Sequence, residues 1–185
     1  MYNNLNRAGQ IATIDLYNIT QIIHMNLQNG MKRIVRVAIS GLVGGGAWIV
    51  GMIIFFGPAQ SILADPNFQS AKFKAVMEEM EPLPRMANNI WIILVGLLGI
   101  GIIYSMVFSF IGPKLSGTNF QKGIQFGLVG WSLMVPWFEF YLPWNVMHEP
   151  TLLVLLEAFC WILVMLLVGI AIALTNGFLD TKIRM

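Results

Sequence analysis

Charged residues are scarce in this chain. Asp, Glu, Lys and Arg make up 11% of its 185 residues, whereas hydrophobic residues make up 57%. A typical soluble domain is about 25% charged, so this composition excludes an ordinary soluble globular domain. The mean hydropathy of +0.71 indicates the same. The composition therefore predicts an all-α integral membrane protein.

Cysteine and histidine are also scarce. One cysteine, Cys160, excludes an intrachain disulfide. The two histidines, His24 and His148, lie outside the long apolar runs, where a haem or chlorophyll would need a ligand. One histidine with scattered carboxylates also lacks the spacing of a metal site such as H-E-x-x-H. We therefore expect no metal and no cofactor.

Catalytic and nucleic-acid-binding motifs are missing. The sequence has no G-x-S-x-G, no phosphate-binding loop and no dinucleotide-binding glycine pattern between a strand and a helix. The net charge of +2 is ordinary for a membrane protein, and no run of interleaved basic and aromatic residues follows a phosphate backbone. We expect no nucleic-acid partner, and an enzyme is less expected than a non-enzymatic protein.

Long uncharged runs are present instead. Residues 37–56 and 86–112 each reach the ~20 residues that cross a hydrocarbon core. In the second half, Glu139 and Glu157 interrupt the apolar sequence, and two further spans fit around them. The sequence thus predicts a four-transmembrane-helix bundle in one membrane domain, 35–185. The spans are expected at about 37–56, 88–112, 123–143 and 151–175.

The first 34 residues form a separate segment. Leu16, Ile19, Ile23 and Leu27 recur at helical spacing and predict an amphipathic helix from about residue 14 to 29, on the cytoplasmic surface. Such a helix is either an interfacial anchor or a docking element for a partner subunit.

The loop 57–87 opens with the turn signals "FFGPAQ" and "ADPN". Phe73, Val76, Met77 and Met80 then follow at helical spacing. We expect a short interfacial helix there, on the outer membrane face.

The distribution of Lys and Arg predicts the orientation. Eight of them flank the spans on the side of both termini, and three, Lys72, Lys74 and Arg85, lie in the 57–87 loop. By the positive-inside rule both termini are cytoplasmic, and we expect a bacterial inner (cytoplasmic) membrane.

Small residues recur four positions apart within the spans. In lipid this spacing allows close approach of helix backbones. The contacts are either within the bundle or between subunits of an oligomer. The residues expected at helix interfaces are Ser40, Gly41, Gly44, Gly45, Gly51, Gly123, Gly127, Gly169 and Ala173.

Three carboxylates and a histidine lie in or beside the last two spans, at Glu139, His148, Glu149 and Glu157. If the turn between these spans covers residues 145–150, Glu139 and Glu157 reach a similar depth on antiparallel helices. Two carboxylates in a low dielectric share a proton, hold a cation or pair with a base. The alternative is structural: Glu139 and Glu149 are solvated, and Glu157 bonds to an indole or a carbonyl near Pro136.

Two functions follow from these patterns. The first is a non-enzymatic accessory or structural subunit that packs against itself, other membrane subunits and lipids through its small-residue faces. The alternative is a small transporter or proton-linked membrane protein with a polar pocket around Glu139 and Glu157. An enzyme is third, because its catalytic residues would have to come almost wholly from the four polar residues above.

Overall fold

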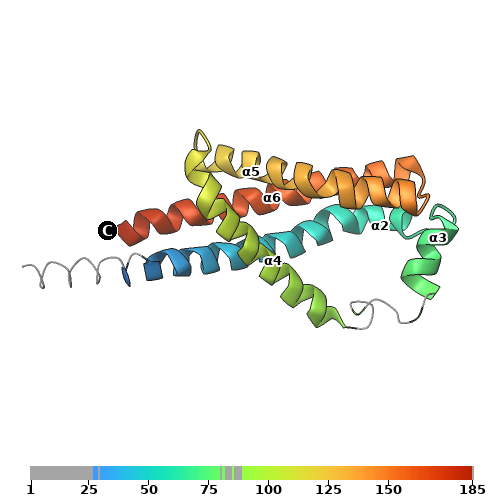
Figure 1. The fold of residues 1–185 in the computed structure, drawn as a ribbon, viewed down its shortest axis with the longest axis horizontal. Helices are drawn as coiled ribbons and strands as arrows, with labels where there is room; N and C mark the ends of the chain where they lie inside the picture. Colours follow the sequence, from blue (N-terminus) through green and yellow to red (C-terminus); the bar gives the residue numbers. More distant parts are fainter. Residues whose placement is uncertain (1–26, 29, 80, 82–84, 86–88, 185) are drawn as a thin grey trace, which may run out of the picture. The chain divides into compact units, whose positions relative to one another are not determined.

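The computed structural model describes residues 27–28, 30–79, 81, 85 and 89–184 (Figure 1). It divides the chain into two units, 1–36 and 37–185, and each is described by itself. In the first unit, the described residues 27–28 and 30–36 are helical. Most of the amphipathic helix predicted for residues 14–29 lies outside the described residues.

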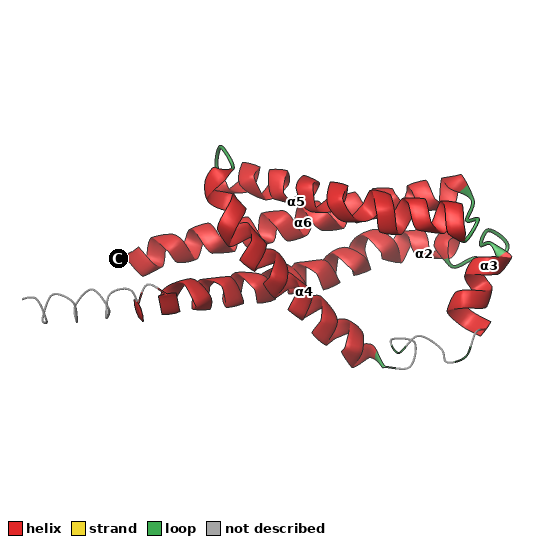
Figure 2. Cartoon of the chain, in the orientation of Figure 1, coloured by secondary structure: helices red, strands yellow, loops and turns green. Residues whose placement is uncertain are grey.

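The described residues form helices and turns, with no strand among them (Figure 2). Within this part of the chain, three helices are long and apolar enough to cross a membrane: Gly30–Leu63, Ile90–Lys114 and Thr151–Lys182. The prediction of an all-helical protein with membrane-spanning helices is confirmed at this level. The fourth predicted span, 123–143, is helical but is not one of these three.

The first long helix continues beyond its predicted end at residue 56. It is α-helical over residues 30–51, π-helical in η1 (Met52–Phe56) and α-helical again in α2 (Gly57–Leu63). The expectation of a turn at "FFGPAQ" is therefore wrong. Pro58 falls in the first turn of α2, where a missing N–H and a fixed φ are compatible with a helix.

A loop of residues 64–70 then leads to a short helix. Ser70 caps α3 (Ala71–Lys74) by accepting a hydrogen bond from the Phe73 N–H at 3.0 Å. The π-helical η2 (Ala75–Glu79) follows directly. A helix therefore exists at Phe73 and Val76, while Met80 lies outside the described residues and the position of this helix at a membrane surface stays a prediction.

Helix α4 (Ile90–Ile111) and the 3₁₀ turn η3 (Gly112–Lys114) form the second long helix. Asn89 caps its first turn through the Trp91 N–H. In its most apolar window only 11% of the residues are buried, against 44% for the last helix. Most side chains of α4 are therefore exposed and do not pack against the rest of the protein.

Helices α5 (Asn119–Val135), η4 (Pro136–Val146) and α6 (Thr151–Arg184) form an antiparallel hairpin (Figure 1). The α-helical pattern changes to π-helical at Pro136, which has no N–H to donate to the preceding turn. Two indole bonds join the helices along their length: Trp131 Nε1 donates to Ala158 O, and Trp144 Nε1 donates to Thr151 Oγ1, each at 3.1 Å.

Glycines make two close helix crossings. In the first, Gly41 and Gly45 of the first helix face Gly101 of α4, and a Cβ on Gly41 would lie 2.5 Å from the Ile102 Cα. A real Cβ at this position would clash with the facing backbone. The two backbones can therefore touch here because glycine has no side chain.

The second crossing joins α5 to α6. Gly123 and Gly127 face Gly169, and a Cβ on Gly127 would lie 2.5 Å from the Met165 carbonyl oxygen. The remaining predicted small residues also lie at helix contacts or are buried: Gly44 faces Ile172, Gly51 faces Val164, and Ser40 and Ala173 are buried.

The core combines one polar contact with a chain of aromatic rings. Ser40 Oγ and Ser105 Oγ are 2.9 Å apart, and Asn176 Nδ2 donates to Ser40 Oγ at 3.5 Å, so three helices are joined by buried polar groups. Edge-to-face ring pairs with centroids 5.1–6.0 Å apart connect the first helix, α4, α5 and α6. In order, the rings are Phe56, Trp161, Trp48, Tyr104, Phe126 and Phe108.

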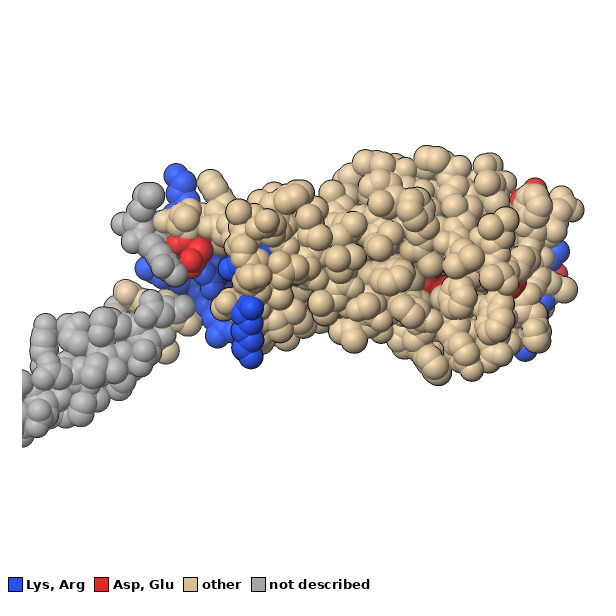
Figure 3. Space-filling view, turned by 90° about the horizontal axis from the view of Figure 1, so that it is seen from above, with Lys and Arg blue, Asp and Glu red and all other residues tan. Residues whose placement is uncertain are grey.

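Charged side chains largely avoid the sides of the helices. On the face shown in Figure 3, the surface over the helices consists almost entirely of uncharged residues, and the charged side chains show mainly at the two ends. The end at which α2 and α3 lie contains the turns 64–70 and 147–150, and we call it the turn end (Figure 1). The uncharged belt is the surface that a hydrocarbon environment requires.

Candidate functional site

The structure brings Glu139 and Glu157 together near the turn end. Glu139 lies on η4 and Glu157 on α6, both side chains are partly buried, and the two are within electrostatic range of one another. Cys160, one turn further along α6, donates its thiol to the Phe55 carbonyl at 3.4 Å. The hairpin thus places two like charges at one depth, where ionising both is costly.

The turn between η4 and α6 depends on His148. Its backbone has φ 58°, in the left-handed region, and its side chain is exposed. This conformation closes the end of η4, with Met147 N donating to Leu142 O at 3.3 Å and Glu149 N donating to Pro143 O at 3.0 Å. His148 therefore shapes the turn with its backbone, while its imidazole points outward.

Glu149 is buried, which contradicts the expectation of a solvated turn residue. Its side chain is 5% exposed. Its Oε1 accepts a hydrogen bond from the Ser70 N–H at 3.0 Å, and Ser70 Oγ donates to the Met147 carbonyl at 2.6 Å. The 64–70 loop folds over this turn and removes the carboxylate from solvent, a long-range contact that the local sequence does not reveal.

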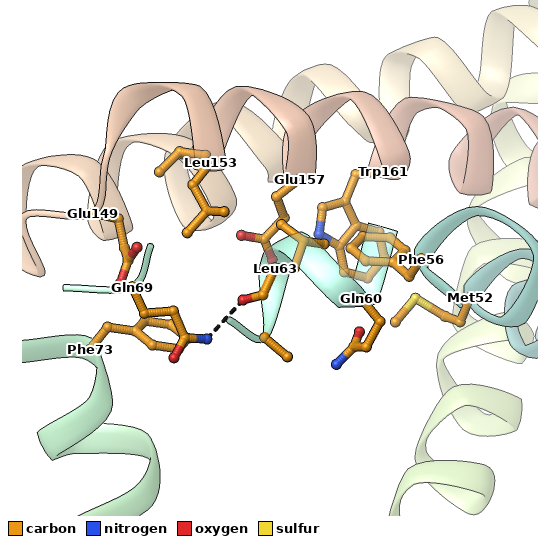
Figure 4. Close-up of a pocket in the computed structure, with 12 residues that line it drawn as sticks. Met52, Phe56, Gln60, Leu63, Gln69, Phe73, Glu149, Leu153, Glu157 and Trp161 are labelled. Atoms are coloured by element: carbon orange, nitrogen blue, oxygen red, sulfur yellow. Dashed lines mark hydrogen bonds between the residues drawn. The ribbon is translucent and has the colours of Figure 1, made fainter. Parts of the chain in front are cut away.

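A cavity of about 400 Å³ lies beneath this loop (Figure 4). Its walls come from η1, α2, the start of α6 and the 64–73 segment. The lining residues are Met52, Phe56, Gln60, Leu63, Ala64, Gln69, Phe73, Glu149, Leu153, Val154, Glu157 and Trp161. Two carboxylates and two carboxamides thus share the cavity with aromatic and aliphatic side chains.

Two polar atoms of the lining residues, Gln69 Oε1 and Glu149 Oε2, are buried and have no hydrogen-bond partner among the described residues. The Trp161 indole lies beside the carboxyl groups of Glu139 and Glu157. The other end of the Gln69 carboxamide is fixed, because its Nε2 donates to Leu63 O at 2.8 Å (Figure 4). Both unpartnered atoms have almost no accessible surface, so they lie within the wall of the cavity and do not face its open space.

The cavity is acidic. It contains Glu149 and Glu157, and its lining, all of which the structure describes, includes no Lys, Arg or His. Glu139 is close to Glu157 but does not line the cavity. His148 lies beside a separate, more open depression with Trp144, Asn145 and Glu149. Of the four predicted polar residues, the cavity therefore takes only Glu149 and Glu157.

Sequence reasoning missed three of the five polar residues that line this cavity. The contributions of Gln60, Gln69 and Trp161 need the packing of η1 and the loop against α6. A signal existed for Gln60 and Gln69, which are uncharged polar residues beside an apolar span. The described residues contain no group of three or more His, Cys, Asp or Glu side chains arranged to hold a metal ion.

Comparison with known proteins gives no relative: no protein family, curated protein or solved structure matches this chain. The class of protein therefore rests on the fold of the described residues, which is helical and includes three helices long and apolar enough to span a membrane.

Proposed function

We propose that the chain is a four-span, non-enzymatic membrane protein of a bacterial inner membrane, and that it acts as a small proton-linked transporter through the acidic cavity. Both termini are cytoplasmic, and the turn end lies at the outer face. The single observation that supports this function is the cavity, whose lining includes Glu149 and Glu157 and no Lys, Arg or His.

The α5–η4 hairpin arm supports four spans. Its 17 α-helical and 11 π-helical residues exceed the ~20 that cross a hydrocarbon core. Gly123 contacts Ile170, Trp131 bonds to Ala158, and Trp144 bonds to Thr151, so the arm follows α6 through most of that apolar helix. An arm at the same depth as a spanning helix spans as well.

Aromatic side chains and charge support the orientation. Trp137, Phe138 and Trp144 of η4 are exposed near the turn end, as rings at a membrane interface are. Lys114 at the end of η3 and Lys122 in the first turn of α5 lie on the opposite side, which the positive-inside rule makes cytoplasmic.

Proton movement tests the function. The protein is reconstituted in liposomes containing a pH-sensitive dye, a membrane potential is imposed, and internal pH is followed. We expect proton entry faster than in empty liposomes, loss of that excess in Glu157→Gln, and no change in Glu79→Gln, an exposed carboxylate on η2. Equal rates in wild-type and empty liposomes, or in wild type and Glu157→Gln, would contradict the proposal.

An accessory or structural subunit is the second candidate, and the exposure of α4 favours it. A Cβ built on Gly96 or Gly99 meets no atom within 4 Å, and the neighbouring Val95 is 66% exposed. A second membrane helix could approach closely along this face. Native mass spectrometry of the protein in nanodiscs tests this. A complex that Gly99→Leu dissociates would support it, and a monomer throughout would contradict it.

A further inference from the structure

One segment of the chain covers the acidic cavity at the turn end. We propose that residues 64–74 form a lid, which closes the cavity while Ser70 is bonded to the hairpin turn and opens it when those bonds break. This proposal deepens the proposed function, since it names what controls access to the same cavity.

The lid is held together by its own hydrogen bonds. Asp65 Oδ1 accepts from Asn67 N at 2.8 Å and from Asn67 Nδ2 at 2.9 Å. Lys74 Nζ, at the end of α3, donates to Pro66 O at 3.0 Å. Ser70 also caps α3, so the loop and the helix are joined. Because these bonds lie within the lid, they are kept when the lid moves as one body.

Ser70 attaches the lid to the hairpin turn. Its Oγ donates to the Met147 carbonyl at 2.6 Å, and its N–H donates to Glu149 Oε1 at 3.0 Å. Gln69 Nε2 instead donates to Leu63 O, at the end of α2. The lid therefore stays attached to α2 when Ser70 is released from the turn.

Apolar packing holds the lid weakly. The structure describes all residues from 64 to 74, and none of their side chains is buried. Ala64, Gln69 and Phe73 are the lid residues that line the cavity, and each is at least partly exposed. Segments with few buried apolar contacts open at low cost in free energy. The two Ser70 bonds therefore supply a large share of what keeps the lid closed.

The attachment point lies between two hollows. Glu149 lines the acidic cavity, and it also lines the open depression with Trp144, Asn145 and His148. The residue that accepts the Ser70 N–H thus belongs to the wall between the depression and the cavity. Release of Ser70 frees one side of this wall, and water can then pass from the depression into the cavity.

Labelling of a thiol in the cavity tests the lid. Leu153 of α6 lies between Glu149 and Glu157 in the sequence and lines the cavity (Figure 4). Leu153→Cys is introduced into the full-length protein in nanodiscs, and its rate of reaction with a membrane-impermeant maleimide is measured. When opening and closing are fast compared with the reaction, this rate follows the fraction of molecules with an open lid.

Two changes at Ser70 separate its bonds to the turn from its capping of α3. Ser70→Asp keeps an acceptor for the Phe73 N–H, because aspartate is a good N-cap. An ionised aspartate cannot donate to the Met147 carbonyl, and it places a like charge beside Glu149.

We expect Ser70→Asp to raise the labelling rate roughly tenfold, since the lost hydrogen bond and the added charge both favour the open lid. Ser70→Thr keeps the hydroxyl and should label at the original rate. Equal rates with serine and with Ser70→Asp would overturn the proposal.

The native Cys160 is the matched control, because it is buried and does not line the cavity. In the chain without Leu153→Cys, we expect Ser70→Asp to leave the slow reaction of Cys160 unchanged. An increase at Cys160 equal to that at the cavity thiol would show that the whole bundle loosens, and it would also overturn the lid.

The two proposals fail in different ways. Proton movement that depends on Glu157, together with labelling that does not depend on Ser70, would overturn the lid and leave the transport function standing. Labelling that depends on Ser70 without any proton movement would uphold the lid and contradict proton-linked transport.

Discussion

The glycine crossings and the turn end use opposite kinds of packing. At the crossings backbones touch, and the buried polar side chains Ser40, Ser105 and Asn176 bond to one another. At the turn end side chains keep the helices apart, a cavity of about 400 Å³ remains, and Gln69 and Glu149 keep unpartnered atoms. The crossings are therefore tightly packed and their buried polar groups are hydrogen-bonded, whereas the turn end contains a cavity and polar atoms without partners.

Residue chemistry accounts for the difference. Glycine lacks a Cβ, so two helices can approach until their backbones meet. Pro136 and Pro143 in η4 cannot donate backbone hydrogen bonds, and the helix changes to wide π turns there. Met52 and Phe56 of the π-helical η1 also line the cavity. Irregular helix turns therefore flank the open region, while regular helices form the closed one.

The largest expected effect comes from closing the space at a crossing. Gly127→Leu forces a side chain into the Met165 backbone and should destabilise the protein by roughly 3 kcal/mol or more. Gly99→Leu, where a Cβ meets no atom within 4 Å, should leave stability nearly unchanged. Chemical denaturation in detergent measures both. Equal stabilities would show that the crossings are not backbone contacts.

The second prediction separates the two carboxylates that the hairpin brings together. Because Glu157 lines the cavity and Glu139 does not, Glu157→Gln should abolish the proton entry above the rate of empty liposomes, and Glu139→Gln should reduce it clearly less. The liposome assay with the pH-sensitive dye compares both variants. A larger loss in Glu139→Gln would move the proton pathway to the η4 side of the pair.

The third prediction concerns the buried Ser40 hydroxyl, which is hydrogen-bonded within the core. Ser40→Ala removes the hydroxyl that lies 2.9 Å from Ser105 Oγ and accepts from Asn176, and it should cost about 1 kcal/mol of stability. Ser132→Ala is the matched control, since the exposed Ser132 bonds to the Val129 carbonyl of its own helix. The same denaturation assay compares them, and an equal loss in both would remove the special role of the buried group.

The smallest expected effect concerns the turn. His148 holds φ 58°, which a β-branched residue adopts poorly and glycine adopts freely. His148→Val should be less stable than His148→Gly by about 1 kcal/mol, as thermal unfolding can show. If the valine variant is as stable as the glycine variant, the left-handed turn does not constrain this end of the protein.

The sequence by itself determined the helical class and much of the packing. Uncharged runs of sufficient length form long apolar helices, because a backbone away from water must bond to itself. Small residues four apart lie on one helix face, and Gly123 and Gly127 indeed face α6. Counting outward from the turn placed Glu139 and Glu157 at one depth, since a hairpin of two helices fixes that register.

Only the tertiary structure decided which polar residues form the site. Glu149 is buried because Ser70, 79 positions earlier, folds over it, and no local pattern specifies that contact. Gln69 and Trp161 join the cavity through the same long-range packing, while His148 and Glu139 stay outside it. Hydropathy and spacing act along one helix, whereas a cavity depends on how several helices and a loop fill space together.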